Sequence, residues 1–99
     1  MKAFRWLGND GYQYLIGCTK EDADDIIRIF GRRAKAPTMP SDDGIKYSYY
    51  IVNTRDKVIM PILYLSWVFG GHADEPLVGE ECSLALVLDG YRFHAGNAY

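Results

Sequence analysis

The chain has 99 residues, enough for one domain with one core. It carries 11 lysines and arginines against 13 aspartates and glutamates, a formal net charge of −2. That balance argues against a dedicated duplex-DNA binder, which normally presents a basic surface. The longest apolar run, 58–69, is too short to cross a bilayer, so we expect no membrane association.

The N-terminal residues contain no apolar segment of the kind found in a signal peptide. The two cysteines, Cys18 and Cys82, do not make a disulfide framework. We therefore expect a single compact domain over 1–99 that works in the cytoplasm with both thiols reduced.

The first two apolar runs predict a pair of strands. Phe4–Leu7 and Tyr12–Cys18 each alternate apolar and polar side chains, so that one face of each strand is more apolar than the other. Between them lies Gly8-Asn9-Asp10-Gly11, whose residue types favour turns. The pattern indicates an antiparallel connection between neighbouring strands.

Residues 20–30 predict the one helix of the fold. Thr19 begins a sequence that resembles a capping box, and Gly31 is a typical C-terminal cap. Acidic residues crowd the first turns and basic residues gather at the other end, which complements the helix dipole. Four apolar residues recur at helical spacing and define the buried stripe: Ala23, Ile26, Ile27 and Phe30.

Two polar stretches are predicted as loops. The first, 31–44, contains Pro37, Pro40 and a Ser-Asp-Asp-Gly sequence, which exclude regular structure. The second, 71–81, contains four acidic residues and no lysine or arginine. Loops this long in a small domain are often functional.

The stretch 45–71 holds the most concentrated apolar surface, and the core is expected to form around it. Two β-branched and aromatic runs flank the polar residues 53–57, which predicts a hairpin. The second run, 58–69, is ambiguous because Pro61 can begin a short helix, but its composition favours a strand. On the first strand one face carries Tyr47, Tyr49 and Ile51, and the other Lys46, Ser48, Tyr50 and Val52.

A second hairpin is predicted near the C-terminus, where Ser83–Leu88 and Tyr91–His94 flank Asp89-Gly90. The predicted order is thus ββ–α–ββ–ββ. We expect an α+β fold, with an antiparallel sheet of about four to six strands and one helix packed on one face.

The sequence contains no recognisable catalytic or metal-binding motif. Cys18, His72 and His94 can supply a thiol and a base, but Cys18 lies in an apolar run, where packing in the core is its commoner role. Ligand pairs at zinc or calcium spacing do not occur. We predict no catalytic residue, metal or cofactor, and a small Cys/His enzyme stays the third alternative.

Two charged regions give the leading hypotheses for binding. In the first, acidic residues face a basic surface of a protein partner, with aromatic anchors nearby. These residues are Asp74, Glu75, Glu80 and Glu81, with Trp67, Phe69 and Tyr91 as anchors. In the alternative, a basic cluster and strand tyrosines bind nucleic acid or a nucleotide. That set is Arg28, Arg32, Arg33, Lys35, Tyr47 and Tyr49.

In its small size, lone helix, antiparallel sheet and polar loops, the predicted domain resembles the small phage-encoded inhibitors of host defence, anti-CRISPR proteins among them. General features alone carry the resemblance, and no motif does. It implies a viral, non-catalytic protein in the host cytoplasm that inhibits or adapts a larger partner, such as a nucleic-acid-handling enzyme. A strand with exposed edge groups also leaves a homodimer open.

Overall fold

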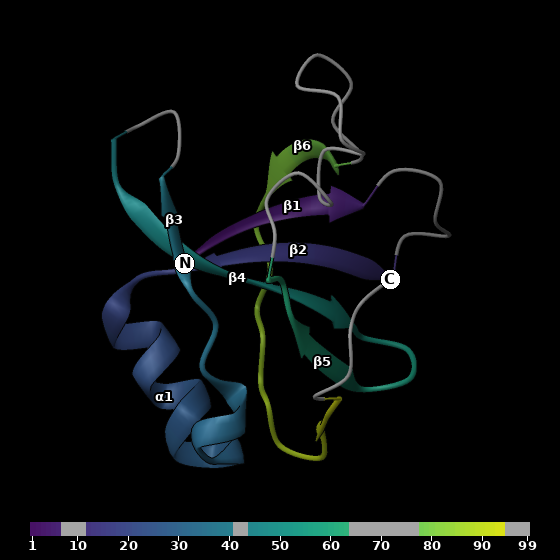
Figure 1. The fold of residues 1–99 in the computed structure, drawn as a ribbon. Helices are drawn as coiled ribbons and strands as arrows, with labels where there is room; N and C mark the ends of the chain where they lie inside the picture. Colours follow the sequence, from purple (N-terminus) through teal and green to yellow (C-terminus); the bar gives the residue numbers. More distant parts are fainter. Residues whose placement is uncertain (7–11, 41–43, 64–77, 95–99) are drawn as a thin grey trace.

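The computed structural model describes residues 1–6, 12–40, 44–63 and 78–94. Over these residues one helix, α1 (Lys20–Phe30), packs with a mixed, mostly antiparallel sheet of seven strands (Figure 1). The strands are β1 (Lys2–Trp6), β2 (Gln13–Cys18), β3 (Thr38–Pro40), β4 (Lys46–Asn53), β5 (Val58–Pro61), β6 (Val78–Cys82) and β7 (Arg92–Phe93). The α+β fold class predicted from the sequence is therefore confirmed.

The sheet is built around β4. In the order β6-β1-β2-β4-β5-β7, β4 pairs with β2 along one edge, while β3 and β5 share its other edge. All pairs are antiparallel except β5 with β7, which is parallel. The predicted hairpin at 45–71 is confirmed as far as Pro61, the last residue of β5. Residues 58–61 therefore form a strand and not the start of a helix. Residues 64–69 of that run lie outside the described part of the chain.

Because successive side chains of a strand point to opposite faces, β4 contributes to two cores. Tyr47, Tyr49 and Ile51 pack in one cluster with Leu15 and Ile62. Tyr50 and Val52 pack in the other, which we call the helix-side core and which also contains Ile16, Cys18, Ala23, Ile26, Ile59 and Phe93. The division of β4 into these two faces agrees with the prediction.

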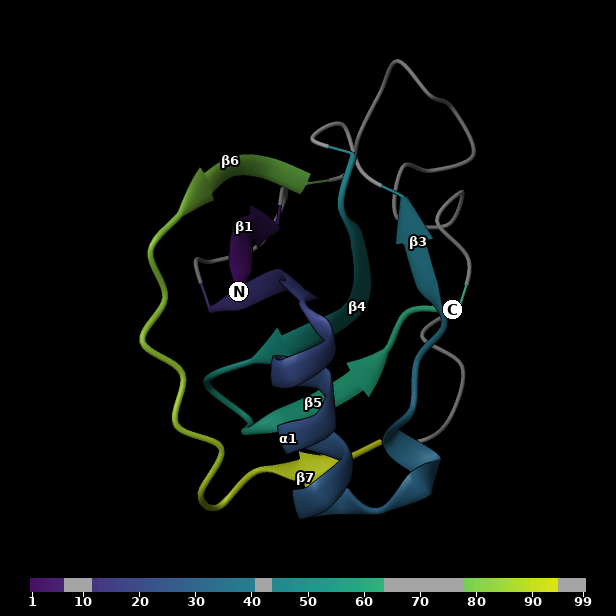
Figure 2. The ribbon, with the colours of Figure 1, turned by 90° about the vertical axis from the view of Figure 1, so that its left-hand side faces the viewer.

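Helix α1 begins and ends where the sequence predicts. The Thr19 hydroxyl accepts a hydrogen bond from the backbone N–H of Asp22, and Gly31 ends the helix with a φ of 90°, which favours glycine. Ile26 is 3% exposed, whereas Ile29, one turn further along the helix, is 54% exposed. Figure 2 shows α1 lying across the sheet. In the described residues, no helix is long and apolar enough to span a membrane.

The prediction that 31–44 lacks regular structure is wrong. A 3-10 turn, η1, spans Arg32–Ala34, and Thr38–Pro40 forms β3. The Tyr50 hydroxyl donates to the carbonyl of Ala34 at 2.6 Å, which holds the turn against β4. Proline is compatible with a short edge strand because an edge leaves some backbone N–H positions without a ladder partner.

The predicted C-terminal hairpin is also wrong in its pairing. Asp89-Gly90 does form a turn, and Gly90 has a φ of 83°. The flanking segments do not pair with each other, because β7 joins β5 while Ser83–Leu88 belongs to no ladder of the described residues. The last part of the predicted acidic loop is strand β6, which pairs with β1.

Candidate functional site

Ser83–Leu88, which we call the bridging segment, connects the two outer strands of the sheet. It runs from the end of β6 to the turn before β7, and Figure 2 shows it passing along one side of the molecule. Its side chains alternate in burial, with Leu84, Leu86 and Leu88 packed against the helix-side core. Val87 points outward and is 73% exposed. The segment thus has the side-chain pattern of a strand.

The backbone of the bridging segment has few hydrogen-bond partners among the residues that the structure describes. Within the described ranges, its one backbone hydrogen bond runs from the N–H of Tyr91 to the carbonyl of Leu88 at 3.0 Å. Each residue of a strand carries an N–H and a carbonyl that a ladder would engage. An extended backbone of this kind can accept another strand.

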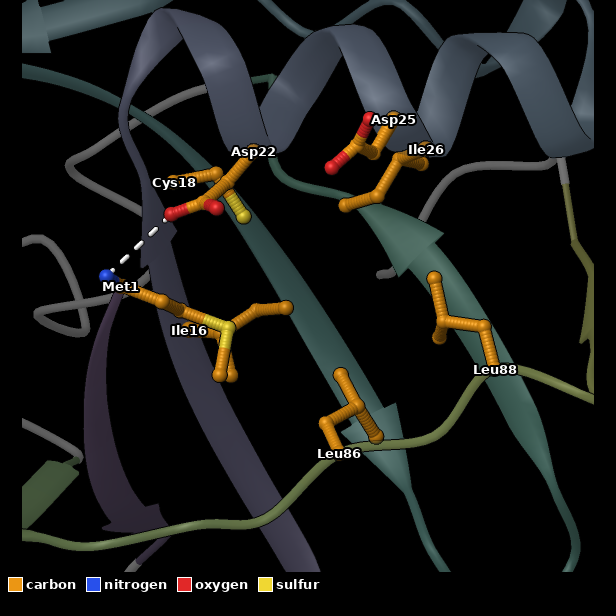
Figure 3. Close-up of a pocket in the computed structure, with 8 residues that line it drawn as sticks. All are labelled: Met1, Ile16, Cys18, Asp22, Asp25, Ile26, Leu86 and Leu88. Carbon is orange, nitrogen blue, oxygen red and sulfur yellow. Dashed lines mark ion pairs between the residues drawn. The ribbon is translucent and has the colours of Figure 1, made fainter.

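A pocket of about 210 Å³ lies between α1 and the bridging segment (Figure 3). Ile16 and Cys18 line it from β2, Ile26 from the helix, and Leu86 and Leu88 from the bridging segment. Figure 3 shows Ile26 pointing from the helix towards the two leucines. The remaining lining residues are Met1, Asp22 and Asp25.

Two carboxylates line the helix side of the pocket, and each forms an ion pair within the chain. The Asp22 Oδ2 atom lies 3.2 Å from the α-amino nitrogen of Met1, and the Asp25 Oδ1 atom accepts from Arg28 Nη2 at 2.6 Å. The Asp22 and Asp25 side chains are 41% and 54% exposed. Because an ionised carboxylate accepts several hydrogen bonds, both groups have capacity for a further donor from solvent or a partner.

Cys18 lies at the pocket as a packed thiol. It is 1% exposed, and burial, with a smaller contribution from the charge of Asp22, raises its pKa from 9.0 to about 12. The thiolate is the nucleophilic form, and the raised pKa disfavours it at neutral pH. His94 is exposed, His72 lies outside the described residues, and in those residues no three metal-ligating side chains gather.

We predict that Cys18 resists thiol reagents in the folded protein. In a Cys82→Ser variant near neutral pH, a disulfide-exchange reagent should label Cys18 only after unfolding in urea, because the native thiol is buried and protonated. Stoichiometric labelling of the folded variant would contradict this assignment. As a control, Cys82 in a Cys18→Ala variant is half-buried and should react without denaturant.

The same pKa shift has a definite sign for stability. A folded-state pKa above the unfolded value favours the protonated thiol, so the stabilisation is complete below about pH 9. It is lost as the pH rises towards 12, where the folded thiol ionises. Burial also raises the pKa of Tyr50 to about 12, which acts in the same direction over the upper part of that range.

The predicted acidic and aromatic partner-binding residues fall into different places. Asp74, Glu75, Trp67 and Phe69 lie outside the described residues. Glu80 and Glu81 belong to β6 and not to a loop, and Glu81 is exposed opposite Phe4 of β1. Tyr91 is half-buried against the helix-side core, so its ring is committed to packing more than to a partner.

The predicted nucleic-acid set is not brought together. Tyr47 and Tyr49 are 5% and 6% exposed in the core cluster away from the helix, so their rings offer no free face for stacking. The basic side chains near the end of α1 are exposed, but Arg28 pairs with Asp25, and Arg33 lies 5.6 Å from the centre of the Phe93 ring. The exposed members of the basic cluster are Arg28, Arg32, Arg33 and Lys35.

Reasoning from the sequence missed the pocket and the position of the bridging segment outside the ladders of the described residues. The alternation of Leu84, Leu86 and Leu88 did signal an extended segment with one buried face. No local signal showed that this segment would lie apart from the ladders and face the helix. Comparison of the chain with protein-family models, curated proteins and solved structures found no match.

Proposed function

We propose that this chain is a non-catalytic interaction protein that binds a larger protein and inhibits or adapts it. The observation that supports the proposal is the bridging segment, an extended backbone with exposed outward side chains and a single backbone hydrogen bond to the described part of the chain. Proteins recognise such backbones by adding a strand, in which main-chain hydrogen bonds supply affinity and side-chain pockets supply specificity. The partner would align one of its own strands with this segment.

The charge around the bridging segment favours a protein over a nucleic acid. Residues 78–91 contain Glu80, Glu81 and Asp89 but no lysine or arginine. A phosphate backbone would be repelled there, whereas a basic protein surface would be attracted and would associate faster. In its specific form, the proposal is that the chain inhibits a nucleic-acid-handling enzyme, as anti-CRISPR proteins do. It would act in the cytoplasm, where the free thiols of Cys18 and Cys82 stay reduced.

The direct test is amide hydrogen exchange of the chain alone and with the stoichiometric protein captured from lysate of its native host. Exchange across residues 84–87 should slow in the complex, because a ladder would protect the amides that strand addition engages. Unchanged exchange of these amides in the complex would contradict strand addition. Failure to capture any stoichiometric protein would overturn the proposed function itself.

A matched pair of variants tests whether the bridging segment forms the interface. Val87→Lys should weaken binding of the captured protein about tenfold, because it places a solvated charge in the centre of the proposed contact. Ile29→Lys makes the same change at an exposed position on the outer face of α1 and should leave affinity unchanged. Equal effects of the two substitutions would place the interface elsewhere.

A further inference from the structure

We propose that the pocket between α1 and the bridging segment receives one apolar side chain of an extended partner peptide. A lysine or arginine of that peptide would lie next to Asp22 and Asp25 at the helix side of the pocket. The inference rests on the proposed function, because the bridging segment supplies the backbone with which the peptide pairs. It adds the chemical character of the partner sequence.

The size and walls of the pocket suit a side chain. Its volume of about 210 Å³ lies below the roughly 300–1,000 Å³ typical of sites for drug-sized ligands. Four of its eight lining residues are aliphatic: Ile16, Ile26, Leu86 and Leu88. An aliphatic group from a partner would replace water there and gain contacts on both the helix and the bridging segment.

The pocket lies where strand addition would deliver such a side chain. Leu86 and Leu88 point towards the helix across the pocket (Figure 3). Val87, between them in the sequence, is 73% exposed. A peptide strand beside this segment would share its alternation, since paired strands present side chains to the same two faces. One peptide side chain would therefore enter beside the two leucines, and its neighbours would point outward next to Val87.

Charge complementarity selects the flanking residue of the peptide. Asp22 and Asp25 are three positions apart on α1, so their carboxylates lie on one face of the helix. Each already pairs with a cationic nitrogen, from Met1 and Arg28 respectively, and the two carboxylate side chains stay 41% and 54% exposed. A basic peptide residue would join or exchange with these ion pairs, and an acidic one would be repelled.

Three synthetic probe peptides with fluorescent labels test the inference by anisotropy. The first carries a central leucine between alternating valines and threonines, with a lysine at each end. The second replaces the leucine with alanine and should bind about tenfold more weakly, because the pocket would be left unfilled. The third replaces the lysines with glutamates and should bind about two- to fivefold more weakly, because exposed ion pairs contribute little.

Two variants of the protein complete the design. Asp25→Lys should remove the preference for the lysine-ended probe over the glutamate-ended one. Asp24→Lys is the matched control, since Asp24 is exposed, pairs with Lys20 at 3.3 Å and does not line the pocket. Both positions are exposed on the helix, so neither change is expected to disturb folding.

Several results would overturn the inference: no binding of the leucine probe, equal binding of the leucine and alanine probes, or equal effects of Asp24→Lys and Asp25→Lys. These results leave the proposed function standing if the captured protein still protects the amides of 84–87. If that protection is missing while the leucine probe binds selectively, the pocket recognises an apolar side chain without strand addition, and the proposed mode of binding fails instead.

Discussion

Ile26→Ala should lower the free energy of unfolding by about 2–5 kcal/mol, measured by urea denaturation. The Ile26 side chain projects from α1 into the helix-side core and is 3% exposed. Truncation removes buried methyl groups and leaves a cavity that the sheet beneath cannot fill, and the cost of such changes in cores spans this range. A loss of this size is a large share of the ~5–15 kcal/mol typical of a whole domain.

Ile29→Ala on the same helix is the matched control. Ile29 is 54% exposed, so the identical chemical change should alter the free energy of unfolding by no more than about 0.5 kcal/mol. Because both substitutions replace isoleucine with a better helix former, helix propensity cancels in the comparison. Equal losses for the two variants would show that the buried face of α1 is not the one containing Ile26.

The helix could be predicted from the sequence because its signals are local. Thr19 satisfies the backbone at one end, Gly31 adopts a positive φ at the other, and both lie next to the residues they affect. The buried stripe follows from a spacing of three and four residues, although Ile27 is less buried than Ile26. Such features need no knowledge of distant parts of the chain.

The pairing of the C-terminal segments could not be predicted in the same way, although the two earlier hairpins, β1 with β2 and β4 with β5, were. Alternation in 83–88 and 91–94 reports which side chains share a face, but it does not report which strand lies alongside. The Asp89-Gly90 turn suits a hairpin, yet Phe93 packs in the helix-side core with its ring 5.7 Å from that of Phe30, in a strand parallel to β5. The turn forms, but β7 pairs with β5 and not with the segment before the turn.

The pocket is a product of tertiary structure, which explains why the sequence did not reveal it. Its walls come from β2, α1 and the bridging segment. Ile16 and Leu88 therefore line the same pocket, although they lie far apart in the sequence. No spacing rule connects residues so far apart. The sequence also could not show that Glu80 and Glu81 lie in a strand and not in a loop, since β6 is set by its pairing with the distant strand β1.

Tyr50→Phe should lower the free energy of unfolding by about 1–3 kcal/mol without changing the fold. The Tyr50 side chain is fully buried, and its hydroxyl donates to the Ala34 carbonyl at 2.6 Å. Phenylalanine preserves the ring and its packing but leaves that buried carbonyl without its donor, and a buried polar group that loses its partner carries a cost in this range. Urea denaturation of the two proteins measures the difference.

Tyr12→Phe serves as the control. The Tyr12 ring is half-buried, and the Arg55 Cζ atom lies 4.0 Å from the centre of that ring. This contact does not involve the hydroxyl and survives its loss. That variant should therefore stay within about 0.5 kcal/mol of the parent. A second effect separates the two: because Ala34 belongs to η1, Tyr50→Phe should also speed amide exchange across 32–36. If stability falls but exchange there is unchanged, the Tyr50 hydroxyl stabilises the core without fastening η1 to β4.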